Sequence, residues 1–226
     1  MTGVQTCALP IYKAMLKPLI SVGRWSVVNQ VGSILFLSVD LVIANRYLGV
    51  SATGIYAALL VWPMMIRTMA GYIGVNFTPS FVELHAKSEH EKLAKYGILS
   101  VRIMSLLTVG PVIVLSALSA PLLNEWLGVE WVQHQYLLDI MLLNLIFNVP
   151  VISLFGLLQA TTNMKVLGLA TLATGFMNVA TAVLLSTQTS LGLWGIALAG
   201  IVWFNIKNAI FLPVYVKHVL GSPEFT

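Results

Sequence analysis

Three charged residues stand well inside long apolar stretches of this sequence, and their side chains are the best candidates for binding an ion or a charged ligand. Asp40, Arg67 and Lys207 are each flanked by many apolar residues on both sides. A charge at the centre of a bilayer costs roughly 2.5–3.5 kcal/mol on insertion scales, so such a residue usually faces a bundle interior or a water-filled cavity. The three positions therefore indicate a polar interior that can hold an ion or a charged ligand.

The composition explains why lipid has to be considered at all. Of the 226 residues, 58% are hydrophobic and only 9% are charged, and the mean hydropathy is +0.89. A soluble domain carries about 25% charged residues, so this chain has too little polar surface to cover a globule in water. The net charge is +4, but its Lys and Arg residues lie singly between apolar runs. This distribution excludes a nucleic-acid binder, which would gather its cations on one face.

Six apolar segments are long enough to cross a bilayer, which takes about 20 residues. We expect helices at 21–47, 54–81, 96–118, 136–160, 164–185 and 193–216. A transmembrane barrel would instead show alternating segments of about 10 residues. The sequence therefore predicts an all-α integral membrane protein, with residues 12–221 forming one bundle of six transmembrane helices.

The two ends of the chain are treated separately. Residues 2–11 look like a translated sequencing adapter and include Cys7, the only cysteine. We therefore interpret residues 1–11 as an artefactual leader, and the cysteine count says nothing about the redox compartment. Residues 222–226 are interpreted as a truncated tail, so we expect the chain to be a fragment.

The distribution of cations between the segments predicts the orientation of the bundle. Three lysines fall in the loop 82–95 and Lys165 lies between the fourth and fifth segments, whereas 119–135 and 186–192 contain no Lys or Arg. Only Arg46 lies near the poorly charged side. By the positive-inside rule, both ends of the chain are expected to be cytoplasmic.

Two loops have recognisable character. The second loop places Glu83 four residues before Lys87, and Glu91 four residues before Lys95. This spacing predicts a solvated helical hairpin held by ion pairs along each helix. The loop 119–135 carries two tryptophans and two glutamates, which predicts a short amphipathic segment at the outer membrane interface.

Several strings, taken in order, carry a resemblance to a known family. They are VDLVIANRYLGVSATGIYAALLVW, NFTPSF, LSAPLLNEWLG, GFMNVATAVLL, LGLWGIALAG and FLPVYVKHVLG, and together they cover most of the chain from Lys17 to Gly221. They resemble the multidrug/oligosaccharidyl-lipid/polysaccharide (MOP) exporter superfamily, particularly its polysaccharide and O-antigen flippases. The resemblance implies a MATE-like transporter of two six-helix lobes around a central cavity. This chain would be one lobe, more like the second than the first, with its partner lobe missing.

Depth along the helices groups the candidate cavity residues. At about 1.5 Å per residue, Arg67 and Lys207 lie about 25 Å from the outer loops, and Asn29 and Gln30 lie at a similar depth. Such a layer would suit an anionic pyrophosphate-linked substrate, and Asn178, central in its segment, is a further cavity candidate. Alternatively, the cations pair within the lobe or extend to the interface, and the amides form bonds between helices.

Asp40 lies nearer the outer end, about 15 Å from the turn. It is a candidate for coupling transport to a proton or Na⁺, and it can equally accept a hydrogen bond from a neighbour such as Tyr56. Asn144 and Asn148, one helical turn apart, are expected to bond between helices. Prolines inside the apolar runs allow kinks, which alternating access would use.

The resemblance and the cation layer together predict a flippase lobe in a bacterial inner membrane. Its substrate would be a polyprenyl-pyrophosphate-linked glycan, and alternating access its mechanism. We expect no enzyme, cofactor or metal, because the sequence shows no Walker loop and no metal-ligand spacing of His, Cys, Asp and Glu. One alternative is a multidrug extruder, whose cationic substrates would favour more acidic residues in the cavity. Another is a membrane glycan polymerase or acyltransferase, which would need a large charged outer loop. The third is a purely structural subunit.

Overall fold

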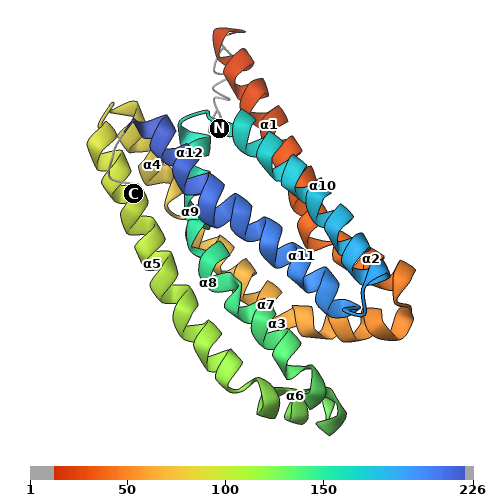
Figure 1. Ribbon diagram of the computed structural model, residues 1–226. Helices are drawn as coiled ribbons and strands as arrows, with labels where there is room; N and C mark the ends of the chain where they lie inside the picture. The colour runs from red at the N-terminus through yellow and green to blue at the C-terminus, as the bar shows by residue number, and fades with distance from the viewer. Residues whose placement is uncertain (1–12, 222–226) are drawn as a thin grey trace, which may run out of the picture.

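Every regular element among the described residues is a helix (Figure 1). The computed structural model describes the backbone of residues 13–221 and the side chains of residues 20–221. The interpretations of residues 1–11 and 222–226 therefore lie outside the described residues. In chain order the elements are α1 (Lys13–Leu37), α2 (Val39–Tyr47), α3 (Val50–Val75), α4 (Thr78–Ala86), α5 (His90–Ala117), α6 (Ser119–Leu127), η1 (Val129–His134), α7 (Gln135–Leu143), α8 (Leu145–Asn148), η2 (Pro150–Ile152), α9 (Ser153–Ala160), α10 (Met164–Gln188), α11 (Leu193–Asn205), η3 (Ile206–Phe211) and α12 (Leu212–Leu220).

Six stretches of helix among the described residues are long and apolar enough to cross a membrane, which confirms the predicted all-α bundle. They are Ile20–Tyr47, Val50–Ala86, His90–Ala117, Val129–Ala160, Met164–Gln188 and Leu193–Leu220. Several extend beyond the expected bounds, most of all around the second loop. The reason is that apolarity marks the part of a helix in lipid, whereas the helix itself continues into water wherever paired charges support it. Glu83 and Lys87 are paired there at 2.6 Å, and Glu91 with Lys95, as the spacing predicts.

Four of the six spans are interrupted, the second of them at Asn76 and Phe77, between α3 and α4. The first breaks at Ser38, between α1 and α2. The fourth breaks at Asn144 and again at Pro150, and the sixth contains a π-helical turn, η3. By contrast, Pro63 and Pro111 lie inside α3 and α5 without ending them. Irregular backbone at membrane depth requires polar partners inside the protein, so these breaks point to where polar side chains gather.

The backbones of α1 and α10 cross in direct contact, and the two helices lie side by side in Figure 1. A Cβ atom added at Gly32 would lie 2.7 Å from the backbone nitrogen of Leu172. One added at Gly168 would lie 2.9 Å from the carbonyl oxygen of Trp25, and one at Gly175 would lie 3.0 Å from that of Gly32. Small residues permit this close approach, as is usual between membrane helices.

The buried apolar side chains form two clusters rather than one continuous core. The first includes Tyr56, Leu59 and Leu138, and the second includes Phe81 and Leu157. Phe36 and Phe204 are also buried, yet they belong to neither cluster. Both line the cavity described below, together with polar side chains.

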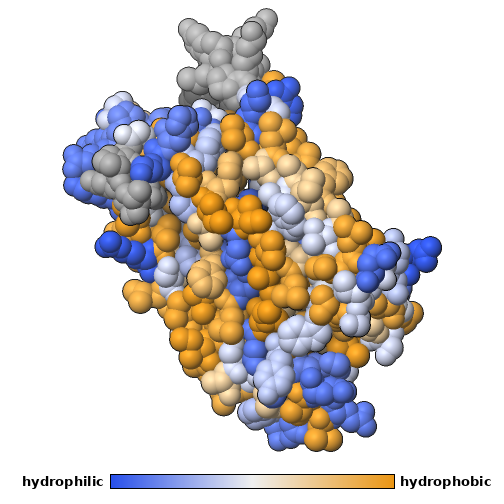
Figure 2. Space-filling model, in the orientation of Figure 1, coloured by the Kyte–Doolittle hydropathy of each residue, from blue (hydrophilic) through white to orange (hydrophobic). Residues whose placement is uncertain are grey.

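The outer surface is strongly apolar. Figure 2 shows apolar residues over much of the visible face, with hydrophilic residues towards the ends of the molecule and in a narrow band down its middle. Large exposed side chains include Leu106 at 79% and Val214 at 64% exposure. Part of the segment 119–135 forms the short helix α6, and its Trp126 packs edge-on against Trp62 with ring centres 5.8 Å apart.

Candidate functional site

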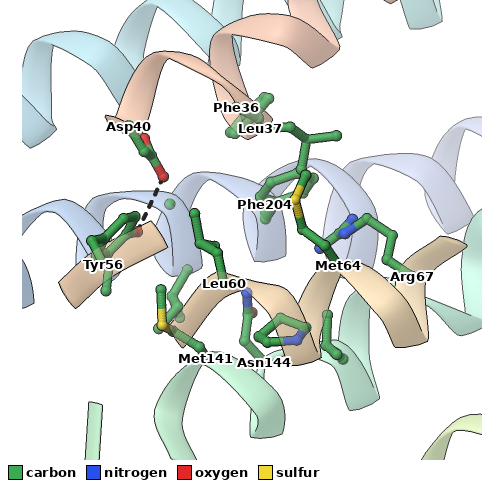
Figure 3. Close-up of a pocket in the computed structure, with 15 residues that line it drawn as sticks. Phe36, Leu37, Asp40, Tyr56, Leu60, Met64, Arg67, Met141, Asn144 and Phe204 are labelled. Atoms are coloured by element: carbon green, nitrogen blue, oxygen red, sulfur yellow. Dashed lines mark hydrogen bonds between the residues drawn. The ribbon is translucent and has the colours of Figure 1, made fainter. Parts of the chain in front are cut away.

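A cavity opens between four of the six spans, beside the first apolar cluster. Its wall combines residues of α1 and α2, α3, α7 and α8, and α11, and the space inside it that a water-sized group can occupy is about 70 Å³. Among the lining residues, Asp40, Tyr56, Arg67, Asn144 and Phe204 carry polar or aromatic groups (Figure 3). Two of the predicted site residues, Asp40 and Arg67, therefore share one cavity.

Asp40 lies in the first turn of α2, immediately after the break at Ser38. Its side chain is buried, and Tyr56 Oη donates a hydrogen bond to Asp40 Oδ2 at 3.2 Å, which confirms the expected partner. The other carboxylate oxygen, Oδ1, has no hydrogen-bond partner among the described residues. Buried polar oxygens normally accept a hydrogen bond. The unpaired Oδ1 of Asp40 is therefore an acceptor that remains open beside the cavity.

Asn178 lies with Asp40 rather than with the two cations. It is fully buried on α10, and its Nδ2 donates to the backbone oxygen of Leu35 at 3.3 Å. Its Oδ1 has no partner among the described residues. A Cβ atom added at Gly200 would lie 3.9 Å from both Asn178 Oδ1 and Asp40 Oδ2. Asn178 Oδ1 and the Asp40 oxygen that accepts from Tyr56 therefore both lie near the backbone of Gly200.

Arg67 and Lys207 meet at one aromatic ring. The Arg67 Cζ atom lies 4.7 Å from the centre of the Phe204 ring, and the guanidinium end points towards that ring in Figure 3. The Lys207 Nζ atom lies 5.5 Å from the same ring centre, 5.5 Å from that of Phe36 and 5.4 Å from that of Phe155. The ring faces attract the cations, but within the described part of the chain neither cation forms an ion pair with a carboxylate.

Lys207 is almost completely enclosed, with 3% of its surface exposed. It does not line the cavity itself but lies next to it, behind the rings of Phe36 and Phe204, which do. The two cations predicted to share a layer are thus brought together, one in the wall and one beside it. An aromatic enclosure without a counter-ion leaves an ammonium group able to attract an anion once the rings shift.

Asn29 and Gln30 do not join this group. Asn29 Oδ1 accepts a hydrogen bond from Thr171 Oγ1 at 2.8 Å, between α1 and α10. Gln30 is exposed, and neither residue lines the cavity. Successive helical residues point about 100° apart, so residues expected at one depth can face different neighbours. Depth alone therefore does not decide which residues face inward.

Four asparagines form a hydrogen-bonded group that we call the asparagine cluster: Asn144, Asn148, Asn205 and Asn208. The predicted bonding of Asn144 and Asn148 between helices is confirmed, and their partners lie on the sixth span. Asn205 and Asn208 were not predicted from the sequence as members of a polar site. Their spacing of three residues, on either side of Lys207, was the available signal.

The site offers charge and hydrogen bonding rather than metal ligands. Among the described residues, no three His, Cys, Asp or Glu side chains gather in a group that could hold a metal ion. What is present is a cationic pair at Phe204 and a pair of free acceptors at Asp40 and Asn178. Such an arrangement can bind an anionic group at one place and a proton or small cation at the other.

Comparison with known proteins gives one clear likeness. The chain is 39% identical, over 205 residues, to the uncharacterized membrane protein EpsK of Bacillus subtilis (strain 168). The matched region covers 91% of this chain but only 41% of that protein, so the chain spans about two fifths of its relative's length. No family model and no solved structure matches the chain. Six apolar helices and the likeness to a membrane protein together identify the chain as a multi-pass membrane protein.

Proposed function

We propose that this chain is one lobe of a flippase that moves a polyprenyl-pyrophosphate-linked oligosaccharide across a bacterial inner membrane. The observation that carries the proposal is the meeting of Arg67 and Lys207 at the ring of Phe204, in and beside a cavity, with no ion-paired carboxylate. Buried cations without a partner are costly. An arrangement of this kind persists where an anionic ligand supplies the missing charge.

A phosphoryl group is the anion that this pair would suit best. The planar Arg67 guanidinium can form two parallel hydrogen bonds to phosphate oxygens, while the ammonium of Lys207 acts as a compact charge. The glycan would occupy the open part of the cavity, and the polyprenyl chain would stay in lipid against the apolar outer surface. This division would account for a small cationic pocket within a bundle whose outer surface is apolar.

The proposed transport step is alternating access between two lobes. In the resembling family a second six-helix lobe supplies the opposite wall of the cavity. The relative EpsK has more than half of its length outside the matched region, which is room enough for such a lobe. Broken helices near the cavity, at Ser38, Asn144 and η3, are the kind of element on which transporters of this type rely.

The proposal includes an orientation. Loop cations cluster in and around the α4–α5 hairpin, whereas the segment 119–135, which holds α6 and η1, has no Lys or Arg. We place the hairpin and both chain ends in the cytoplasm. The anionic head group would then enter the cavity from the cytoplasmic side, where lipid-linked precursors carry their sugars before export. The proposed activity is transport, with no covalent bond made or broken.

The direct test is a reconstitution of the full-length protein in liposomes. We expect a fluorescent polyprenyl-pyrophosphate oligosaccharide to move between leaflets, and a cationic dye to remain untransported. Empty liposomes give the background rate. Transport of the dye without movement of the lipid-linked glycan would favour a multidrug extruder and contradict the proposal.

Asp40 gives a second prediction within the same function. Replacing Asp40 by Asn keeps the shape of the side chain but removes its charge and its ability to take up a proton or pair with Na⁺. We expect glycan transport by Asp40→Asn to lose its dependence on an imposed proton or Na⁺ gradient, because the open acceptor at Oδ1 would no longer attract a cation. Measuring transport with each gradient in turn identifies the ion.

The control for this experiment is Glu125→Gln, which neutralises an exposed carboxylate on α6. It should leave the gradient dependence unchanged. If Asp40→Asn and the parent respond equally to both gradients, Asp40 has no coupling role and its contact with Tyr56 is structural.

A further inference from the structure

The asparagine cluster connects the two most irregular places in the bundle. Asn148 Nδ2 donates to Asn144 Oδ1 at 2.6 Å, and Asn205 Nδ2 donates to the same oxygen at 3.1 Å. Asn208 Nδ2 donates to Asn148 Oδ1 at 3.2 Å, and Asn148 Nδ2 lies 3.4 Å from Asn205 Oδ1. The four amides thus form one continuous group between the fourth and sixth spans.

Each member of the cluster stands at or next to a departure from regular α-helix. Asn144 separates α7 from α8, and Asn148 is the last residue of α8, two residues before Pro150. Asn205 ends α11, and Asn208 lies inside the π-helical turn η3. A π turn holds one residue more than an α turn, and such turns recur at functional positions. The amides therefore join the break in the fourth span to the π turn in the sixth.

The cluster also reaches from the cavity wall to the helical turn that carries Lys207. Asn144 lines the cavity. At the other end, Asn208 follows Lys207 directly in η3, is 2% exposed, and has an Oδ1 atom without a partner among the described residues. A single hydrogen bond would be enough to hold two helices together. Here a chain of amides runs from the cavity wall to the turn that carries Lys207, which indicates a further role.

We propose that the asparagine cluster is a latch that holds the π turn of the sixth span and thereby keeps Lys207 enclosed among its three phenylalanine rings. When the latch opens, the extra residue of the π turn shifts along the helix, which turns Lys207 out of its aromatic enclosure towards the cavity. The four asparagines are positioning residues: they act on Lys207 through the backbone of η3, and a group bound at Asn144 reaches them from the cavity. This inference goes beyond the flippase proposal, because it concerns where Lys207 lies and not what is carried.

The test measures how readily Lys207 reacts. The full-length protein, in lipid nanodiscs, is treated briefly with acetic anhydride, a small reagent that acylates amines, and the modified fraction of each lysine is read by peptide mass spectrometry. Asn148→Leu removes the central member of the cluster, and Asn205→Leu removes a half-buried member with less risk to folding. We expect labelling of Lys207 to rise roughly three- to tenfold in both variants, since one or two hydrogen bonds no longer oppose opening. Lys165, which is exposed, serves as the internal reference.

The matched control is Thr171→Val. It removes a hydrogen bond of similar length between two other spans, the 2.8 Å bond from Thr171 to Asn29, and should leave Lys207 labelling at the parent level. Unchanged labelling in both asparagine variants would overturn the proposal, as would an equal rise in the control, which would mean general loosening. Because no transport is measured, failure here leaves the flippase proposal standing, and failure of the transport assay leaves this result intact.

Discussion

A protein in which Lys207 is replaced by Met, or Arg67 by Gln, should remain in the membrane but export little glycan. Each substitution removes one of the two cations that meet at Phe204. Losing a charged hydrogen-bonding group from an anion site weakens binding roughly ten- to hundredfold, and losing both should abolish export. Surface glycan in a strain lacking the parent gene, scored beside an immunoblot of membrane protein, measures this effect.

The same Lys207 variant should also be more stable than the parent. Its ammonium is buried without an ion-paired partner in the described structure, so an apolar side chain of similar length ought to raise the free energy of unfolding by about 1 kcal/mol. Thermal unfolding in detergent tests this. A gain in stability with a loss of export is the signature of a binding residue, whereas a residue that only holds the fold would lose both.

The exposed Lys87 provides the control, because Lys87→Met removes a cation far from the cavity and should change neither quantity appreciably. Export at the parent level by both Arg67→Gln and Lys207→Met would remove the central support for the proposed function. The remaining argument would be the likeness to a family of flippases.

The largest effect on folding is expected at the crossing of α1 and α10. Gly32→Val places a branched side chain where even a Cβ atom would lie 2.7 Å from the backbone of Leu172 and Thr171. Backbone atoms cannot move aside as a flexible side chain can, so we expect a loss of about 3 kcal/mol or more in stability. Fluorescence-detected size exclusion after mild heating should find little folded protein.

Gly71→Val is the matched control, since a Cβ atom at Gly71 would meet nothing within 4 Å. That variant should elute like the parent. If the two valine variants behave alike, the close approach of the two helices is not what stabilises the lobe.

The sequence was sufficient for the architecture because bilayer thickness sets helix length, and apolar runs report it directly. The charge pairs of the α4–α5 hairpin also followed from spacing alone, as did the partner of Asp40. Helix breaks followed only in part, since Pro150 stands at one of them. Pro63 and Pro111 stay within continuous helices, while Ser38 ends one without any proline or glycine at that position. Tertiary packing decides which interruption becomes a break.

The candidate site was predictable in depth but not in direction. Arg67 and Lys207 were placed at one level by counting residues, and the structure brings them to one ring. Asn29 and Gln30, expected at a similar level, do not line the cavity, because the rotation of a helix about its axis depends on its neighbours. Phe36, Phe155 and Phe204 gave no signal at all, since an aromatic residue in an apolar run reads the same whether it faces lipid or a cation.

The contact between α1 and α10 also bears on how the lobe would deform. The backbones of the two helices touch at Gly32, Gly168 and Gly175. Neither helix can slide or rotate without the other, so we expect the two to move as one rigid unit, called the plate below. The interruptions of the fourth and sixth spans lie outside these two helices and are joined by the asparagine cluster. Motion in this bundle would therefore be uneven, with one helix pair that keeps its shape and other spans that flex where their helices are interrupted. Pairs of spectroscopic probes should report fixed separations within the plate and variable ones across to α12.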